Sequence, residues 1–255
     1  MTQHADTHAL ILGGTQGLGL AIAQALRDGG CRQLVLAARD PVKGRAAAEA
    51  LGAAFVPVDL ADAGSVIACV DRAATMLGRV DALAVAGAST DRGSVLDTTP
   101  DGWDALMAAN AKGPFFAIQR VAQLARTAGH PASIVTILSM VIHCGQSFLA
   151  PYSASKAALA NITRNAANAL RADRIRVNGI ACGWMDTPGE DAMQRKHHGA
   201  GGDWLEKAEA RQPFGMLVKP GHVAGLASFL LGPQSGVMTG AIVDFDQNVN
   251  GAYPE

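Results

Sequence analysis

A tyrosine and a lysine stand four residues apart in the stretch PYSASK, which runs from Pro151 to Lys156. Tyrosine is scarce in this chain, and Tyr152 is one of only two. A phenol has a pKa near ~10 and is therefore a poor base at neutral pH. On a helix, positions i and i+4 lie on one face. The Lys156 ammonium would then favour the phenolate and lower its pKa, as a general acid or base requires.

The size of that shift sets a condition on the site. Moving a tyrosine pKa from ~10 to ~7 takes roughly 4 kcal/mol. An exposed ion pair contributes only about 0–1 kcal/mol. We therefore expect a partly dehydrated site in which a second positive charge assists Lys156. The structural alternative is a surface pair on an amphipathic helix, for which Pro151 would equally well supply the first turn.

A glycine-rich turn, GGTQGLG, spans Gly13 to Gly19 directly after the apolar run Ala9 to Leu12. Glycines permit a tight turn and a close approach of the backbone to a pyrophosphate, and a helix starting at Gly17 would offer unpaired N–H groups. Placed after the first strand of a βαβ unit, the spacing indicates a dinucleotide site. An ordinary glycine-rich turn is the alternative.

The second predicted strand ends in Ala38 and Arg39, where an NAD site usually carries an acid. A guanidinium suits a 2′-phosphate, so this end favours NADP(H), with NAD(H) still possible. Arg39 could instead be solvated or paired with Asp40. Asp59 ends the third strand and is placed to meet the adenine, although it could also cap the next helix, for which Asp62 is better placed.

Apolar runs alternate with helical patterns along the whole chain. The expected strands are 9–12, 34–37, 55–58, 82–85, 133–138, 175–180 and 242–245. The expected helices begin at Gly17 and cover 41–51, 63–76, 100–127, 151–170 and 221–231. Because the strands are continuous apolar runs, this order predicts a doubly wound parallel α/β sheet with both faces covered. We expect one domain, 1–255, with a polar lid or mobile loop at about 188–213.

Composition excludes several classes of protein. Hydrophobic residues make up 49% and charged residues 17% of 255, with a net charge of −1, so nothing points to nucleic acid or a membrane surface. Four scattered cysteines argue against a disulfide framework or zinc site. No basic leader or long apolar segment occurs, so we expect a cytoplasmic protein with no membrane span.

The order of a glycine turn, Asp59, Asn110, Ser139 and the Tyr152/Lys156 pair resembles the short-chain dehydrogenase/reductase family from about residue 9 to 246. The resemblance implies a Rossmann-type sheet of about seven strands and an oxidoreductase that interconverts an alcohol and a carbonyl. It implies that Tyr152 exchanges a proton with the substrate oxygen and that Ser139 polarises that oxygen. Lys156 would hold the nicotinamide ribose, and Asn110 would anchor a relay water. Individually, Ser139 could only cap a strand end and Asn110 could only satisfy helix backbone.

The resemblance also implies a set of cofactor contacts: Gly13, Thr15, Gln16, Gly17, Leu18, Gly19, Arg39, Asp59, Leu60, Ala86, Gly87, Tyr152, Lys156, Gly183, Met185 and Thr187. Two stretches depart from the family pattern. ACGWMDTP carries Cys182 in place of a proline, and LAVAGAS lacks the usual paired asparagines. We expect Cys182 to be a small buried residue, and hydrogen bonding around residues 83–89 to be arranged differently.

Substrate walls are expected at 89–97, 140–149, 184–212 and the C-terminal tail. The named candidates are Ser139, His143, Gln146, Tyr152 and Trp184. Their polarity suggests a sugar, sugar acid or polyol; a 3-oxoacyl-type ketoreductase and a redox-inactive dinucleotide sensor are the alternatives. No metal is expected, since His197 and His198 lack an evident third ligand. The resemblance also implies a homotetramer or homodimer, in which the helices 100–127 and 151–170 would pair across a two-fold axis and Tyr253 could reach a neighbour's site.

Overall fold

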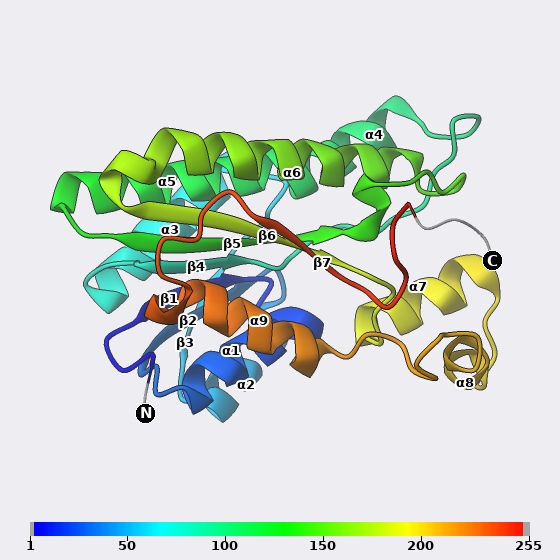
Figure 1. The fold of residues 1–255 in the computed structure, drawn as a ribbon, viewed down its shortest axis with the longest axis horizontal. Helices are drawn as coiled ribbons and strands as arrows, with labels where there is room; N and C mark the ends of the chain where they lie inside the picture. The colour runs from blue at the N-terminus through cyan, green and yellow to red at the C-terminus, as the bar shows by residue number, and fades with distance from the viewer. Residues whose placement is uncertain (1–2, 252–255) are drawn as a thin grey trace.

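The structure is a computed structural model that describes residues 3–251. Its centre is a parallel sheet in the order β3-β2-β1-β4-β5-β6-β7 (Figure 1). The strands are β1 (His8–Leu12), β2 (Gln33–Ala38), β3 (Ala54–Pro57), β4 (Ala82–Val85), β5 (Ala132–Ser139), β6 (Ile175–Cys182) and β7 (Ile242–Phe245). The predicted positions of all seven strands are confirmed to within a residue or two, while Tyr253 lies outside the described residues.

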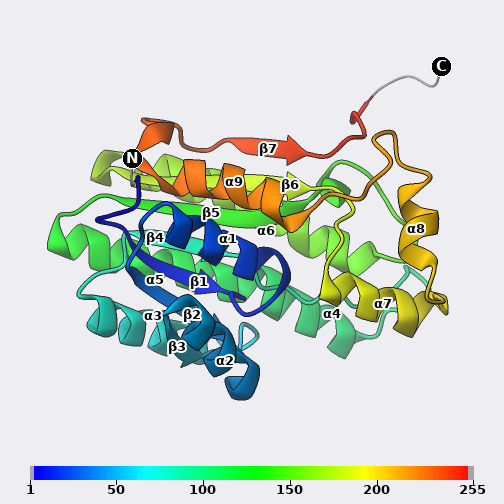
Figure 2. The ribbon, with the colours of Figure 1, turned by 90° about the horizontal axis from the view of Figure 1, so that it is seen from below.

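Helices cover both faces of the sheet (Figures 1 and 2). One face carries α3 (Ala63–Leu77), α4 (Pro100–Met107), α5 (Gly113–Ala128) and α6 (Ala150–Leu170). The other carries α1 (Gly17–Asp28), α2 (Pro41–Leu51) and α9 (Pro220–Leu231). The chain is therefore a Rossmann-type doubly wound α/β protein, as predicted. Within the described residues, no helix is both long and apolar enough to cross a membrane.

Alternation along the strands explains why both faces need helices. In β1, Leu10 and Leu12 pack into the core beneath α3 and α5, whereas Ile11 packs into the core beneath α1 and α9. All three side chains are fully buried. Burying an aliphatic side chain of this size contributes about 1.5–3 kcal/mol, so neither face of the sheet is stable without its helical layer.

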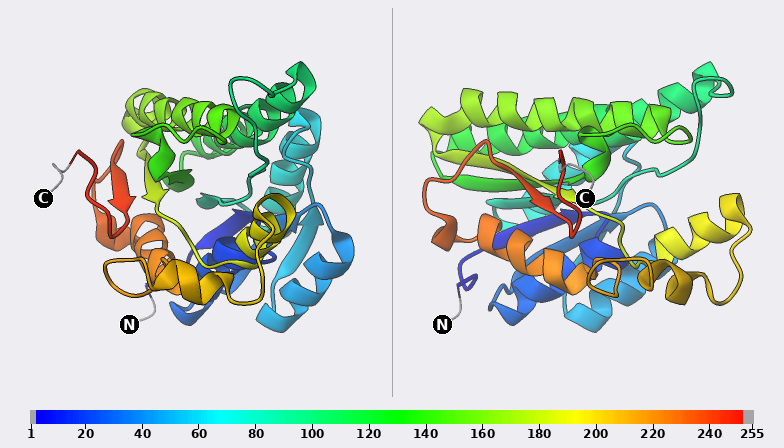
Figure 3. Two further views of the ribbon diagram at one scale, coloured as in Figure 1. Left: turned by 90° about the vertical axis from the view of Figure 1, so that its right-hand side faces the viewer. Right: turned by 45° about the vertical axis from the view of Figure 1, so that its right-hand side comes forward.

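The strand order brings one crevice to the carboxyl end of the sheet. The chain runs outward from β1 to β3, then returns past β1 to begin β4. Successive crossovers therefore leave on opposite faces at β1 and β4, and ligands bind outside the strand ends at such a point. Figure 3 turns this end toward the viewer, with α7 (Pro188–His198) and α8 (Trp204–Glu209) beside it.

Two segments differ from the sequence-based expectation. The segment 188–213 is not irregular, since it forms α7 and α8. The long helix 100–127 is interrupted by a π-helical turn, η1 (Ala108–Lys112), between α4 and α5. Pro114 has no N–H with which to close an α-helical bond to the carbonyl of Asn110, which accounts for the widened turn.

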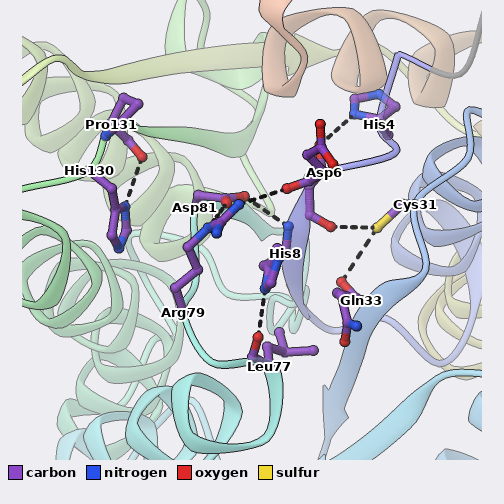
Figure 4. A network of polar contacts seen from close by, with 11 residues as sticks. His4, Asp6, His8, Cys31, Gln33, Leu77, Arg79, Asp81, His130 and Pro131 are labelled. Atoms are coloured by element: carbon purple, nitrogen blue, oxygen red, sulfur yellow. Dashed lines mark hydrogen bonds and ion pairs between the residues drawn. The ribbon is translucent and has the colours of Figure 1, made fainter. Parts of the chain in front are cut away.

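A polar network joins the amino ends of β1 and β4, opposite the crevice (Figure 4). Asp81 accepts hydrogen bonds from the backbone N–H of His8 at 2.9 Å and from Arg79 Nε at 2.6 Å. The ring of His8 contacts the carbonyl of Leu77 at 2.6 Å. These bonds satisfy the backbone at the start of both strands, which is a structural role.

Candidate active site

A cleft of about 1260 Å³ opens at the carboxyl end of the sheet. Every residue predicted to contact the cofactor lines it, and so do Ser139, Gln146, Tyr152 and Trp184 among the predicted substrate residues. The lining comes from the turns that follow β1 through β6 and from the start of α6. The volume exceeds what a drug-sized ligand needs, so the cleft can hold a dinucleotide together with a second small molecule.

The turn after β1 forms a cradle of backbone. Gly13 and Gly17 have φ values of +79° and +52°, which glycine adopts without strain. A Cβ at Gly13 would lie 2.4 Å from Cα of Gly87, and one at Gly19 would lie 2.1 Å from the Gly13 carbonyl oxygen. Gln16 makes no side-chain bond to the start of α1. The N–H groups of that first turn are thus offered to the cleft, and the residues fit a dinucleotide pyrophosphate.

The end of the cleft beyond β2 carries two cations, Arg39 and Lys43, both of which line it. The carboxylate of Asp40 caps α2, accepting from the N–H groups of Val42 at 2.9 Å and Lys43 at 3.1 Å. The Asp40 carboxylate therefore caps the helix and does not pair with the Arg39 guanidinium. Arg39 remains available to bind an anion. Lys43 adds a second positive charge here that was not predicted from the sequence.

Lys156 is almost fully buried, and its Nζ donates a 2.8 Å hydrogen bond to the carbonyl of Ile137. The same Nζ lies 5.8 Å from the centre of the Tyr152 ring. Burial lowers the pKa of Lys156 to about 8. Burial also raises the pKa of Tyr152 to about 12, while the Ser139 hydroxyl acts in the opposite direction. The expected dehydration is present, but without a bound ligand it favours the neutral phenol.

Ser139 and Cys182 end the paired strands β5 and β6 and face each other in register. The hydroxyl of Ser139 accepts from the N–H of Val141 at 3.4 Å, and its own hydrogen can still be donated into the cleft. Burial raises the pKa of the Cys182 thiol to about 12. A thiol that stays protonated is no nucleophile, in agreement with Cys182 as a small buried residue.

Asn110 does not line the cleft but holds its wall together. From η1, its side-chain oxygen accepts from the N–H of Ser89 at 2.8 Å, and its amide donates to the Ser89 carbonyl at 2.8 Å. The amide also donates to Ser155 Oγ at 3.0 Å, and that hydroxyl donates to the carbonyl of Tyr152 at 2.7 Å. This bridge supplies side-chain hydrogen bonds to the backbone of Ser89 and ties that loop to the start of α6.

His143 is the predicted substrate residue that does not line the cleft. Its Nε2 lies 2.8 Å from the carboxylate of Asp244 on β7, so the ring turns toward the sheet edge. The cleft is completed instead by His198 and by polar and aromatic residues that the sequence did not single out: Arg92, Phe148, Glu190 and Gln194. They lie on segments far apart in the sequence, and only the fold brings them together.

The helix α7 is held against the loop that follows β4. Lys196 Nζ and His197 Nε2 lie 2.9 Å and 3.4 Å from one oxygen of Asp91. At the start of the helix, the hydroxyl of Thr187 accepts from the N–H of Glu190 at 3.1 Å. This T-x-x-E capping pattern was the sequence signal for the helix, although the polar composition concealed it. Among residues 3–251, no three His, Cys, Asp or Glu side chains form a metal site.

The fold is that of a Rossmann-type α/β protein with a cleft at the carboxyl end of its sheet. A family model described as enoyl-(acyl carrier protein) reductase matches residues 13–250. A cis-4-hydroxycyclohexanecarboxylate dehydrogenase from Sinomonas cyclohexanicum is 31% identical over 95% of this chain and 96% of its own length. A sorbitol dehydrogenase from Cereibacter sphaeroides is 29% identical over 89% of this chain and 91% of its own length.

Solved structures agree with these relatives. An actinorhodin polyketide ketoreductase with NADPH superposes with a TM-score of 0.89 and is 26% identical, over 97% of this chain and 99% of that one. The chain belongs to the short-chain dehydrogenase/reductase family. Members of this family are oxidoreductases that bind NAD(P)(H) and act on alcohol and carbonyl groups.

Proposed function

We propose that this chain is an NADP(H)-preferring oxidoreductase that interconverts an alcohol and a carbonyl on a small polar molecule such as a sugar, sugar acid or polyol. The carrying observation is that Ser139, Tyr152 and Lys156 line one cleft together with the glycine cradle. No step of the proposed chemistry needs a metal ion. When bound, the nicotinamide supplies or accepts the hydride.

In this proposal Tyr152 is the general acid or base. With a pKa raised to about 12, its phenol is protonated at neutral pH and can give a proton to the oxygen of a carbonyl substrate. Ser139 donates a hydrogen bond to that same oxygen, which stabilises the charge that develops there. Oxidation of an alcohol needs the phenolate instead. A positive charge brought beside Tyr152 would lower its pKa in that direction.

Lys156 and Asn110 would replenish the proton. The side chain of Asn110 is fully engaged by Ser89 and Ser155, so a relay water would bind its backbone carbonyl instead. Pro114 lacks the N–H that would otherwise pair with this carbonyl, which leaves the oxygen available. The π-helical turn is therefore the feature that supports the relay role of Asn110.

The preference for NADP(H) is supported by charge. Arg39 and Lys43 both line the end of the cleft beyond β2, and Asp40 is engaged as the cap of α2. A guanidinium can bind a phosphate through two parallel N–H groups, and a neighbouring ammonium adds a point charge.

We also propose that α7 and α8 act as the substrate lid of one 1–255 domain and that the chain forms a homotetramer or homodimer. The lid assignment is supported by Trp184, which lines the cleft just before α7, and by Glu190, which lines it from the first turn of α7. Assembly is supported by exposed aromatic side chains on the outer helices, Trp103 on α4 and Phe115 on α5, which are 42% and 43% exposed.

A 3-oxoacyl-type ketoreductase is the second candidate, because the polyketide ketoreductase with NADPH is so similar in structure. A redox-inactive sensor is disfavoured by the intact Ser139, Tyr152 and Lys156. A panel of alcohols and ketones with NADP(H) and NAD(H), followed at the reduced-nicotinamide absorbance band, separates the three. We expect turnover of small polar alcohols or ketones. Turnover of acyl thioesters alone would favour the ketoreductase, and tight cofactor binding without any turnover would favour the sensor.

A further inference from the structure

Arg92 is a nearly buried cation on the wall of the cleft, in the loop that follows β4. Its side chain is only 13% exposed. Nη1 donates a 2.9 Å hydrogen bond to the carbonyl of Thr90, and the guanidinium lies 5.8 Å above the ring centre of Phe148. These contacts fix the position of the group but neutralise none of its charge.

The opposite edge of the Arg92 guanidinium has unused donors. Nε is buried and has no hydrogen-bond partner within residues 3–251. Nη2 lies 3.8 Å from Glu190 Oε1, which is too long for a hydrogen bond. A buried donor without an acceptor is costly and uncommon in folded proteins. Nη2–H lies on the same edge as the enclosed Nε–H and also makes no hydrogen bond, so it is the donor on this edge that a carboxylate in the cleft would meet first.

Glu190 is held by other partners. Its Oε1 accepts from Trp184 Nε1 at 2.8 Å and from Gln194 Nε2 at 2.7 Å. To pair closely with Arg92, this oxygen would have to weaken both bonds. The Glu190 carboxylate therefore lies near Arg92 without forming a hydrogen bond to it. The positive charge of Arg92 remains available to a ligand.

We propose that Arg92 binds a carboxylate of the substrate while Tyr152 acts on a hydroxyl or carbonyl elsewhere on the same molecule. The substrate class is then small hydroxy acids and the corresponding keto acids, with Glu190 and Gln194 beside the anion as hydrogen-bond partners for further hydroxyls. This inference rests on the proposed function and selects the acids within it.

Two observations agree with that assignment. Arg92 and Tyr152 line the same cleft, and the charge of Arg92 lowers the pKa of the phenol, an effect that the charge of Glu190 opposes. Of the two relatives, one is named for a hydroxy acid and the other for the uncharged sorbitol. An anchoring arginine favours the first kind of molecule for this chain.

The test compares matched substrates that differ only in charge. Cis-4-hydroxycyclohexanecarboxylate and its carboxamide form one such pair, and other hydroxy acids with their amides extend the panel. In wild type we expect the acids to have the lower KM. Arg92→Gln should raise KM for the acids about 10- to 100-fold, since it removes charge-assisted bonds, and should leave the amides nearly unchanged. Arg92→Lys should recover part of the loss.

Glu190→Gln should change the KM for the acids in the opposite direction to Arg92→Gln. It can keep one or both of the bonds to Trp184 and Gln194 but removes a competing negative charge, so KM for the acids should fall. Arg126→Gln, which removes an exposed pair with Asp173 on the outer surface, is the control and should change neither series. Equal effects of Arg92→Gln on acids and amides would overturn the inference, as would shifts of the same sign in the Arg92 and Glu190 variants.

Binding separates this inference from the proposed function. Calorimetric titration of cyclohexanecarboxylate and its carboxamide into the NADP⁺ complex measures the carboxylate site without turnover. If the acid binds in an Arg92-dependent way but no alcohol is oxidised, the carboxylate site is supported and the proposed chemistry is refuted. Turnover of neutral alcohols, with acid binding absent from wild type, would retain the chemistry and refute the role of Arg92. If Arg92→Gln does not fold, the Glu190→Gln variant and wild-type acid binding still decide the matter.

Discussion

The ammonium of Lys156 donates to the Ile137 carbonyl at 2.8 Å and lies 5.8 Å from the ring centre of Tyr152. The lysine is thus positioned over the phenol ring rather than bonded to its oxygen. Burial lowers the pKa of Lys156 to about 8 and raises the pKa of Tyr152 to about 12. The same dehydration that strengthens their attraction also opposes both charged forms, so further charge from a bound ligand must stabilise the phenolate.

Lys156→Met should alter how stability depends on pH. Below about pH 8 the wild-type lysine is charged in both states, and its burial costs about 3 kcal/mol. Between the folded pKa of about 8 and the ordinary value of 10.5, the unfolded chain binds more protons, so wild-type stability rises with pH relative to the variant.

Urea unfolding at several pH values checks this sign. The stability of Lys156→Met minus that of wild type should be largest near neutral pH and should shrink toward pH 10.5. The exposed Lys112→Met serves as the control and should show no such trend. A difference that grows with pH would contradict the buried-cation account.

Removing the Asn110 bridge should destabilise the chain. Asn110→Leu leaves the backbone N–H and carbonyl of Ser89 without these partners and removes one of the two hydrogen bonds of the Ser155 hydroxyl, so it should cost about 3 kcal/mol or more. Ser155→Ala should cost about 1–2 kcal/mol and lower kcat, because the first turn of α6 carries Tyr152. Ser153→Ala is the matched control, since its buried hydroxyl has no partner within residues 3–251. Thermal unfolding should therefore separate Ser155→Ala from a near-neutral Ser153→Ala; equal shifts would argue against the bridge.

Cofactor preference should depend on the charge at the end of β2. Arg39→Asp should raise KM for NADP(H) about 10- to 100-fold and lower KM for NAD(H), because an acid can bind a ribose hydroxyl but repels a phosphate. Lys43→Gln should weaken NADP(H) alone, by a smaller factor. Steady-state kinetics with both cofactors test this, with Arg45→Gln as a control outside the cleft. An unchanged preference in Arg39→Asp would remove the phosphate role.

Helix α7, part of the proposed lid, should loosen when its contact with the loop after β4 is cut. Asp91 pairs with Lys196 and His197, and these partners hold the pKa of Asp91 below its usual range. Because Asp91 and Lys196 are both more than half exposed, Asp91→Asn should change global stability by only about 0–1 kcal/mol. Trypsin should nevertheless cleave faster at Arg195 and Lys196, and KM should rise. Asp203→Asn, which breaks an ion pair with Lys207 at the start of α8, is the control. Equal trypsin cleavage rates in Asp91→Asn and wild type would refute the role of Asp91 in holding α7.

Much of the fold could be predicted from local sequence patterns. The glycine turn, the seven apolar strands and the YSASK helix could be predicted because each depends on residues adjacent in sequence. The helices α7 and α8 were missed because they are polar and short, so no apolar stripe marks them. The π-helical turn was missed because Pro114 within an amphipathic pattern can begin, end or widen a helix.

Contacts between distant segments explain the rest. Ser155 gains its role only because η1 packs on α6, and Arg92 becomes notable only when α7 brings Glu190 to 3.8 Å. His143 was a substrate candidate because it is a polar residue of the expected wall 140–149, but its ring turns to Asp244 instead. Such pairings across 45 to 101 positions leave no periodic signal in the chain.

Tyr152→Phe tests the central claim most directly, because it removes one hydroxyl and leaves the shape of the cleft intact. The measurement is single-turnover reduction of the best ketone found in the panel, together with the dissociation constant of NADPH. We predict that the rate falls by about 100-fold or more, as expected for loss of a general acid, while NADPH affinity changes less than about threefold. A Tyr152→Phe enzyme that retains the wild-type rate would contradict the account.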